Sequence, residues 1–489
     1  MKTDGIESRW LGKTFDDFLF RPQQGAVQSR RKISLTSRLS ERLSLELPIL
    51  SANMDSVTGM AMAETMALEG GIGIIHRALP VDKQAEKVAK VKRAHGAVIE
   101  NPLCLPKGST IREARAFARR HKITGILIEQ SEGSGILAGL LSNRDIPWLG
   151  EHGERLVEEF MTPFERLHTH PPGISNQDAE RILYQKRIER LPLVDEQRKI
   201  HGLITRKDLL FFRDRPFASK DTKGRLLVSA AIGARGDFVE RSAELIKAGA
   251  DCLVIDIAHG HSQVMGRALD TIRKHFPDIA LICGNVATGA GACFLKEHGA
   301  DAVKVGVGPG RGCRTRLETA AGVPQLQAIR EAWCALGESV PIIADGGIHD
   351  DKDIFLSLIC GASTVMLGSA LSGTDEAPGQ VIEDPATHLK KKIYRGMTSP
   401  QAVLESLYDT ENPEDVEEAF ETPAEGQEMQ VPYKGSVADV LSRIRGHLQS
   451  AVSYAGEQSL AKARAKIVPD PMKYLIPLSE AARRESYER

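Results

Sequence analysis

The chain has 489 residues, of which 42% are hydrophobic, and its 64 basic and 65 acidic residues leave a net charge of −1. This length is typical of roughly three domains, and the balanced charge argues against a general nucleic-acid or membrane-surface binder. The seven cysteines form no Cys-x-x-Cys pair, the start is polar, and no run reaches the ~18 apolar residues of a membrane span. We therefore expect a cytoplasmic protein without a disulfide framework or a zinc site.

Short apolar runs followed by helical patterns recur along the chain. Helices are predicted over 238–248 and 264–275, for example. Continuous apolar strands that alternate with helices are typical of a parallel sheet buried on both faces. Eight such units favour a (β/α)8 barrel, with its active site on the loops that follow the strands, over a doubly wound open sheet. The eight predicted strands span 47–52, 71–76, 226–232, 252–258, 280–286, 302–307, 341–345 and 364–369.

This repeat is interrupted after the second strand by residues 95–215, which carry a duplication of their own. Segments that begin at residues 111, 123 and 139 recur 63 to 65 residues later, which divides the insert into copies at about 95–155 and 156–215. A plain spacer or dimerisation module explains this pattern as well as a nucleotide sensor does. In a sensor, Asp145 and Asp208 would accept hydrogen bonds from ribose hydroxyls. The barrel itself would comprise residues 1–94 and 216–489.

The most informative stretch is residues 306–316, Gly-Val-Gly-Pro-Gly-Arg-Gly-Cys-Arg-Thr-Arg, at the end of the predicted sixth strand. Alternating glycines let the backbone turn sharply and let a ligand approach the main chain. Neighbouring cations favour the nucleophilic thiolate of a cysteine, and Arg311, Arg314 and Arg316 surround Cys313. A lone cysteine is more often an inert core residue, but this setting predicts a reactive one.

Six motifs, in their order along the chain, resemble the IMP dehydrogenase / GMP reductase family, and the insert resembles a tandem CBS (Bateman) module. The family resemblance implies that a cysteine thiolate attacks C2 of a purine nucleotide and that the adduct exchanges hydride with a nicotinamide cofactor. No Gly-x-Gly-x-x-Gly segment opens a Rossmann unit, so barrel loops must bind this cofactor. The six motifs are Ser51-Ala-Asn-Met-Asp-Ser56, Gly70-Gly-Ile-Gly-Ile-Ile-His76, the cysteine loop, Asp345-Gly-Gly347, Gly368-Ser369 and Tyr394-Arg-Gly-Met397.

The resemblance also implies roles for individual residues. Cys313 is then the nucleophile, Thr315 its hydroxyl partner, and Glu376 the acid that relays a proton to leaving ammonia through the threonine. Asp345 would hold the ribose, and the glycines with Ser369 would cradle the 5′-phosphate. The implied substrate contacts are Ser51, Asp345, Gly347, Gly368, Ser369, Tyr394, Gly396, Met397 and Glu425. The implied cofactor contacts are Asp256, Asn285 and Gly306, and a monovalent cation would bind at Gly308, Gly310 and Cys313.

Two reactions share the covalent intermediate, and a flap expected at 396–433 separates them. Dehydrogenases of the family carry an arginine on this flap that activates water. Here the stretch between Gly396 and Tyr433 has ten acidic residues and no arginine or lysine. This favours a GMP reductase that uses NADPH over an IMP dehydrogenase that uses NAD. The motif Ala258-His-Gly-His-Ser262 and the insert itself point toward the dehydrogenase, and an inactive nucleotide-binding paralogue is a third possibility.

The cysteine loop also departs from the family, because Arg311 stands where a serine that touches the substrate phosphate is usual. Arg311 is therefore predicted to pair with that phosphate, and Arg311 or Arg314 to replace the monovalent cation. The remaining expectations follow from the resemblance alone. They are ATP or GTP at the insert, GMP or IMP as the substrate, and a homotetramer or homo-octamer.

Overall fold

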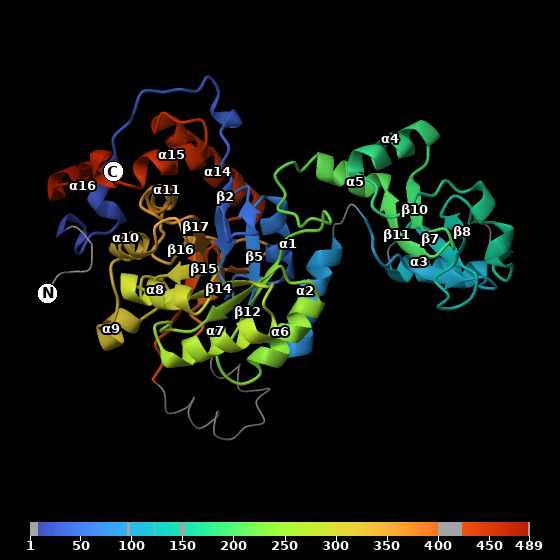
Figure 1. Ribbon diagram of the computed structural model, residues 1–489, viewed down its shortest axis with the longest axis horizontal. Coiled ribbons are helices and arrows are strands. Elements are labelled where there is room, and N and C mark those ends of the chain that lie inside the picture. Colours follow the sequence, from blue (N-terminus) through green and yellow to red (C-terminus); the bar gives the residue numbers. More distant parts are fainter. Residues whose placement is uncertain (1–7, 95–97, 122, 147–151, 400–422, 488–489) are drawn as a thin grey trace. The chain divides into compact units, whose positions relative to one another are not determined.

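The computed structural model describes residues 8–94, 98–121, 123–146, 152–399 and 423–487 (Figure 1). The chain divides into two compact units. The first comprises residues 1–94, 217–221 and 226–489, and the second comprises 95–216 and 222–225.

The first unit is built on a closed barrel of eight parallel strands, which confirms the predicted fold class. Each strand lies within one of the eight predicted apolar runs. The hydrogen-bonded order is β12, β13, β14, β15, β16, β17, β4, β5, so the last strand of the sequence pairs with the first. The strands are β4 (Ile49–Ser51), β5 (Ile72–Ile75), β12 (Ser229–Ile232), β13 (Cys252–Asp256), β14 (Ala280–Val286), β15 (Ala302–Val305), β16 (Ile342–Asp345) and β17 (Thr364–Leu367).

Helices alternate with these strands and surround the barrel (Figure 1). The two helices predicted as examples are present as α6 and α7, and Ser262 caps α7 by accepting a hydrogen bond from the Met265 amide. The barrel helices are α1 (Met60–Leu68), α2 (Val81–Ala94), α6 (Phe238–Lys247), α7 (Gln263–His275), α8 (Gly289–Glu297), α9 (Thr315–Thr319), α10 (Gln325–Leu336) and α11 (Asp351–Ile359).

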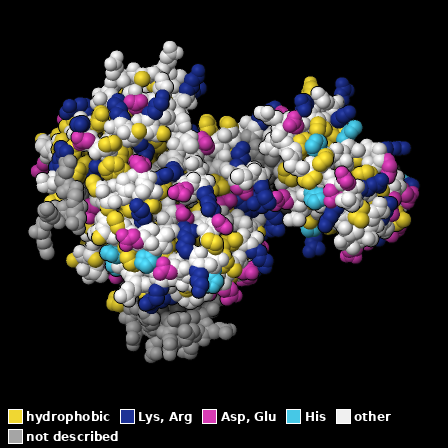
Figure 2. Space-filling view, viewed as in Figure 1, with side chains coloured by type: hydrophobic (Ala, Val, Ile, Leu, Met, Phe, Trp, Pro, Cys, Tyr) yellow, Lys and Arg dark blue, Asp and Glu magenta, His cyan; other side chains and the backbone are white. Residues whose placement is uncertain are grey.

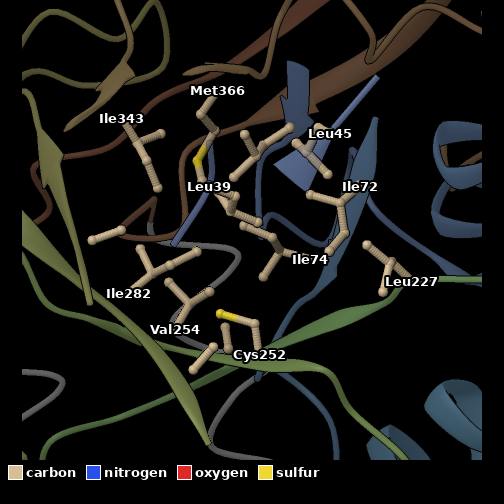
Figure 3. Close-up of a cluster of buried hydrophobic side chains, with 14 of the residues drawn as sticks. Leu39, Leu45, Ile72, Ile74, Leu227, Cys252, Val254, Ile282, Ile343 and Met366 are labelled. Atoms are coloured by element: carbon tan, nitrogen blue, oxygen red, sulfur yellow. The ribbon is translucent and has the colours of Figure 1, made fainter. Parts of the chain in front are cut away.

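Alternate residues of the strands fill the barrel interior (Figure 3). Ile72 and Ile74 come from β5, Val254 comes from β13 and Ile282 comes from β14. Leu45, from the hairpin of β2 (Ser37–Arg38) and β3 (Ser44–Leu45), joins the same cluster and is fully buried. Each such side chain contributes about 1.5–3 kcal/mol through burial, so the interior is a packed core and the chemistry must lie on the rim.

The carboxyl-terminal part of this unit adds a three-stranded antiparallel sheet and further helices. The sheet order is β18, β19, β20, and its strands are β18 (Ile382–Glu383), β19 (Lys390–Arg395) and β20 (Glu428–Pro432). The other elements are α14 (Val437–Tyr454), α15 (Leu460–Ile467), α16 (Glu480–Tyr487), and the antiparallel pair of β1 (Phe18–Phe20) and β21 (Leu475–Pro477).

The second unit repeats a helix followed by two antiparallel strands. The first copy contains α3 (Ile111–His121), β7 (Gly125–Glu129) and β8 (Leu137–Ser142). The second contains α4 (Asn176–Lys186), β10 (Arg190–Val194), β11 (Ile200–Thr205) and then α5 (Arg206–Arg213). The strands β6 (Cys104–Pro106) and β9 (Thr162–Pro163) complete a sheet of order β6, β7, β8, β9.

The visible surface carries both signs of charge, interspersed with apolar side chains (Figure 2), as the net charge of −1 leads one to expect. Across the described residues, no helix combines the length and the apolar character that crossing a bilayer requires.

Candidate active site

The cysteine loop leaves β15 at the carboxyl end of the barrel, and its glycines are required by close contacts. Gly306 has a φ of +149°, and a Cβ there would overlap the carbonyl oxygen of Asp345 on β16. Gly308 has a φ of +79° and packs on the side chain of Arg316. Any larger residue would push the loop away from the neighbouring strand, so this spacing fixes where Cys313 lies.

The thiol of Cys313 begins a short chain of polar groups. Its Sγ lies 3.1 Å from Oγ1 of Thr315, and that hydroxyl lies 2.6 Å from Oε2 of Glu425. The main chain holds this arrangement, because the Arg314 amide donates to the Glu425 carbonyl and Cys313 pairs with Gly426 in a β-bridge.

The direction of these bonds depends on one proton. When the thiol donates to Thr315, the hydroxyl donates to an ionised Glu425. When Glu425 carries the proton it donates to Thr315, and the hydroxyl donates to a thiolate. The three groups can therefore carry a proton between sulfur and carboxyl without any movement of the backbone.

Glu376, the predicted relay acid, is not at this position, and this is a correction to the sequence analysis. Its Oε1 accepts from the Ser436 hydroxyl at 2.9 Å and its Oε2 accepts from the Val437 amide at 2.7 Å. A carboxylate at the amino end of α14 is stabilised by the unpaired amides and the helix dipole. Glu425, which we expected only as a substrate contact, is the carboxylate that contacts Thr315.

The three arginines of the loop have different partners. Arg316 braces the loop by donating to the carbonyls of Val307 and Val323. Arg314 pairs with Glu318 at 2.7 Å, and the Arg311 side chain is exposed. Of the carbonyls proposed as cation ligands, that of Gly310 accepts from the Cys313 amide at 3.0 Å.

The glycine pairs predicted to cradle phosphate lie on loops beside the cysteine loop. Gly347, with a φ of +74°, packs against Pro309. A Cβ on Gly368 would lie 3.1 Å from the Tyr394 hydroxyl. Lys434 donates to the carbonyls of Ser369 and Ala370 at 3.4 and 2.8 Å, which ties the loop after β17 to the chain that follows β20.

Of two expected substrate contacts, Gly396 packs against the cysteine loop and Met397 contacts the loop after β4. A Cβ on Gly396 would overlap the Gly312 carbonyl, and the Met397 sulfur accepts from the Asp55 amide at 3.4 Å. Burial, with the nearby Asp345 carboxylate, raises the pKa of Tyr394 to about 12, so its hydroxyl stays protonated. Ser51, in contrast, is fully buried within β4 and its hydroxyl accepts from Thr58.

The residues predicted for the cofactor end adjacent strands of the barrel. Asp256 accepts from the Asn53 amide at 2.6 Å. The Asn285 amide donates to the Gly306 carbonyl at 2.7 Å and to Asp345 at 2.9 Å. Asp256 of β13, Asn285 of β14 and Asp345 of β16 all bond to Lys304 of β15, a residue that the sequence analysis did not single out. The available signal was a lone lysine between Val303 and Val305 in an otherwise apolar strand.

In the second unit, Asp145 and Asp208 occupy matching positions after β8 and β11. Asp145 Oδ2 accepts from the Ser142 amide and hydroxyl at 2.8 and 2.7 Å, and Asp208 Oδ2 accepts from the Thr205 hydroxyl at 2.6 Å. The predicted flap lies largely outside the described residues, which end at 399 and resume at 423.

The first unit is a (β/α)8 barrel, a fold whose active sites lie at the carboxyl rim, and here a thiol, a hydroxyl and a carboxyl meet at that rim. The IMP dehydrogenase / GMP reductase domain matches residues 12–488. The chain therefore belongs to the IMP dehydrogenase / GMP reductase family, which confirms the resemblance and makes it an oxidoreductase of purine nucleotides that uses NAD(P)(H).

Similar proteins carry both of the family's activities in their names. Inosine-5′-monophosphate dehydrogenases of Nitrosopumilus maritimus and Aquifex aeolicus are each 44% identical to this chain. The matches cover 92% of this chain and 93% of the first relative, and 93% of this chain and 92% of the second. A GMP reductase variant of Trypanosoma brucei, solved in complex with guanosine 5′-monophosphate, is 34% identical, covers 98% of both chains, and superposes with a TM-score of 0.88.

Proposed function

We propose that the chain is a GMP reductase, which converts GMP, NADPH and a proton into IMP, NADP⁺ and ammonia. The stretch between Gly396 and Tyr433, with ten acidic residues and no arginine or lysine, carries this choice. The dehydrogenase must hydrolyse its covalent intermediate, and the resemblance assigns water activation to a flap arginine. A chain without that arginine favours the reaction that consumes no water. The similarity to a solved GMP reductase supports the same choice.

The chain of Cys313, Thr315 and Glu425 supplies the proton transfers that this reaction needs. The thiol proton passes through Thr315 to Glu425, and the thiolate adds to C2 while N3 takes a proton from solvent. Glu425 returns its proton through Thr315 to the 2-amino group, and ammonia leaves with the electrons of the C–N bond. When C2 has become a C–H centre, the C–S bond breaks, C2=N3 re-forms, and the N3 proton returns to the sulfur.

The rim residues fit a nicotinamide group at the predicted cofactor position. The Asp256 side chain is 27% exposed at the end of β13, and a carboxylate beside an amide can bind a carboxamide. When bound in its reduced form, this group supplies the hydride that C2 accepts.

Product identification tests the proposal. Wild-type protein and a Cys313→Ala control are given GMP with NADPH, and separately IMP with NAD, and the purine products are separated by chromatography. We expect IMP from the first pair with the wild type only. Robust formation of XMP from the second pair would replace the proposed reaction by the dehydrogenase reaction.

IMP dehydrogenase is the second candidate, because relatives with that name are 44% identical over most of the chain. The same Thr315–Glu425 pair would then take a proton from the attacking water. The carbonyls of Gly308, Gly310 and Cys313 would hold a monovalent cation in that case, and activity that rises steeply with potassium would favour this candidate.

For the second unit we propose a tandem CBS module that binds ATP or GTP and regulates a homotetramer or homo-octamer. Asp145 and Asp208 support this, because each leaves its second carboxylate oxygen outside the local hydrogen bonds. Asp145→Ala and Asp208→Ala variants should weaken ATP or GTP binding in calorimetry without a change in GMP affinity.

A further inference from the structure

Lys304 is a buried ammonium group at the rim of the barrel. Its side chain is 2% exposed. Its Nζ donates to Asp256 Oδ1 at 2.9 Å, to Asp345 Oδ2 at 2.7 Å and to Asn285 Oδ1. These acceptors end β13, β16 and β14, so one side chain on β15 bonds to three other strands of the sheet.

The charges of this cluster support one another. Burial disfavours a charged lysine, but the two carboxylates raise the pKa of Lys304 above its ordinary value. Burial alone would raise the pKa of Asp256, but Lys304 and the Asn53 amide hold it below the usual value. The ammonium is therefore retained at neutral pH, and Asp256 stays ionised beside it. Arg77 after β5 and the Tyr394 phenol on β19 are the further titratable groups that act on these carboxylates.

The cluster is oriented toward the binding face. The side chains of Asp256 and Asp345 are 27% and 21% exposed, whereas the lysine between them is not. Asp345 uses Oδ2 for both Lys304 and Asn285, which leaves Oδ1 outside these bonds. Asp345 is the proposed ribose contact, and Asp256 and Asn285 are the proposed cofactor contacts, so one cation holds groups of both subsites.

We propose that Lys304 is a positioning residue that fixes Asp345 for the nucleotide ribose and Asp256 for the nicotinamide cofactor and keeps the two carboxylates from repelling each other. This inference rests on the proposed function for its subsites, but not on the direction of the reaction, because GMP and IMP share the same ribose phosphate.

Binding measurements on full-length protein test the role without turnover. The dissociation constants of GMP and IMP are measured by calorimetry between about pH 6 and about pH 9 for wild type and Lys304→Met. In the variant the two carboxylates repel each other once both are ionised, so we expect affinity to fall by about tenfold or more at the alkaline end and to recover toward acid. Lys304→Arg keeps the charge, so its ratio to wild type should not change with pH.

The matched control is Lys92→Met, which removes a second buried lysine that is bonded to two carboxylates at the opposite end of the barrel. It should lower the melting temperature and leave both affinities unchanged. A folded Lys304→Met protein whose affinity ratio to wild type is constant across this pH range overturns the proposal.

A second variant covers the case in which Lys304→Met does not fold. Lys304→Met/Asp256→Asn removes the ammonium with one carboxylate, so no like-charge pair remains and the ratio to wild type should be independent of pH. A ratio that still varies with pH in this double variant also overturns the proposal. The wild-type protein could also make XMP from IMP while Lys304→Met loses nucleotide affinity in a pH-dependent way. That pair of results would refute the GMP reductase assignment and leave the role of Lys304 supported.

Discussion

The two ends of the barrel contain nearly the same arrangement of charges. At the amino ends of the strands, Lys92 of α2 is 4% exposed and donates to Asp221, to Asp251 and to the Leu226 carbonyl, each at about 3 Å. At the carboxyl ends, Lys304 donates to two carboxylates and one amide oxygen.

The difference lies in what surrounds the carboxylates. Asp251 Oδ2 also accepts from the Val228 amide, and Asp221 and Asp251 are only 13% and 11% exposed. That cluster ties Asp251, which directly precedes β13, to α2 and to the segment that leads into β12. The carboxylates around Lys304 are about twice as exposed and border glycine loops. The same ionic group thus supports stability at one end and a proposed binding surface at the other, and four experiments test this difference between the two ends.

The largest effect is expected from Cys313→Ala, which removes the proposed nucleophile at the carboxyl end. Turnover should fall by roughly a thousandfold or more, because no covalent route remains. The affinity for GMP and the melting temperature should stay close to those of the wild type. Steady-state kinetics and calorimetry check this, and loss of nucleotide binding in a folded variant would contradict it.

Lys92→Met is the counterpart at the amino end. Removing one partner of a buried ion pair leaves two uncompensated carboxylates, so the free energy of unfolding should fall by about 3–5 kcal/mol. The kcat of the folded protein should not change, since Lys92 and its partners Asp221, Leu226 and Asp251 lie at the end of the barrel opposite the proposed subsites. Urea unfolding and kcat on one preparation measure both. A large decrease in kcat would remove the division between the two ends.

Glu425→Gln and Glu376→Gln compare two carboxylates within the carboxyl end. Glu425→Gln removes the carboxyl group that contacts Thr315 and should lower kcat by roughly a hundredfold or more. Glu376→Gln removes the carboxylate that accepts hydrogen bonds from Ser436 and Val437, so it should cost about 1 kcal/mol of stability and change kcat little. Equal losses of kcat in both variants would mean that the observed Thr315–Glu425 bond does not carry the proton.

The smallest effect concerns His76, which follows β5 at the same end. Burial, with the cations Lys87 and Arg395, lowers the pKa of His76 to about 4. Among the described residues, neither its Nδ1 nor Asp55 Oδ1 has a hydrogen-bond partner. Between about pH 6.5 and about pH 4 the unfolded chain therefore binds a proton that the folded protein excludes, and stability falls as the pH falls.

Urea unfolding at two pH values measures this effect. From about pH 7 to about pH 5 the free energy of unfolding should decrease by about 2 kcal/mol more in wild type than in His76→Gln. His275→Gln, at an exposed histidine of α7, is the matched control and should behave as wild type. An identical pH dependence in wild type and His76→Gln would exclude a buried neutral histidine.

Local pattern was sufficient to predict the barrel, because each strand is an apolar run that needs no distant partner to be recognised. Local pattern also singled out Cys313, and the resemblance added Thr315, which lies two residues on in the same loop and contacts the thiol. It failed where a side chain chooses between distant partners. Glu425 reaches Thr315 across 110 positions, and Glu376 reaches Val437 across 61, so no spacing rule could assign the two carboxylates. Lys304 was missed for the same reason, since its acceptors lie on three other strands.

The backbone bonds around the flap have a consequence for how the family can diverge. The Gly396 amide donates to the Gln427 carbonyl at 3.0 Å and the Gly426 amide donates to the Thr398 carbonyl at 3.2 Å. The described chain on either side of residues 400–422 is thus held at two adjoining points, one of which pairs with Cys313. A change of sequence or length between these two points therefore leaves the backbone bonds that hold Cys313 beside Gly426 in place.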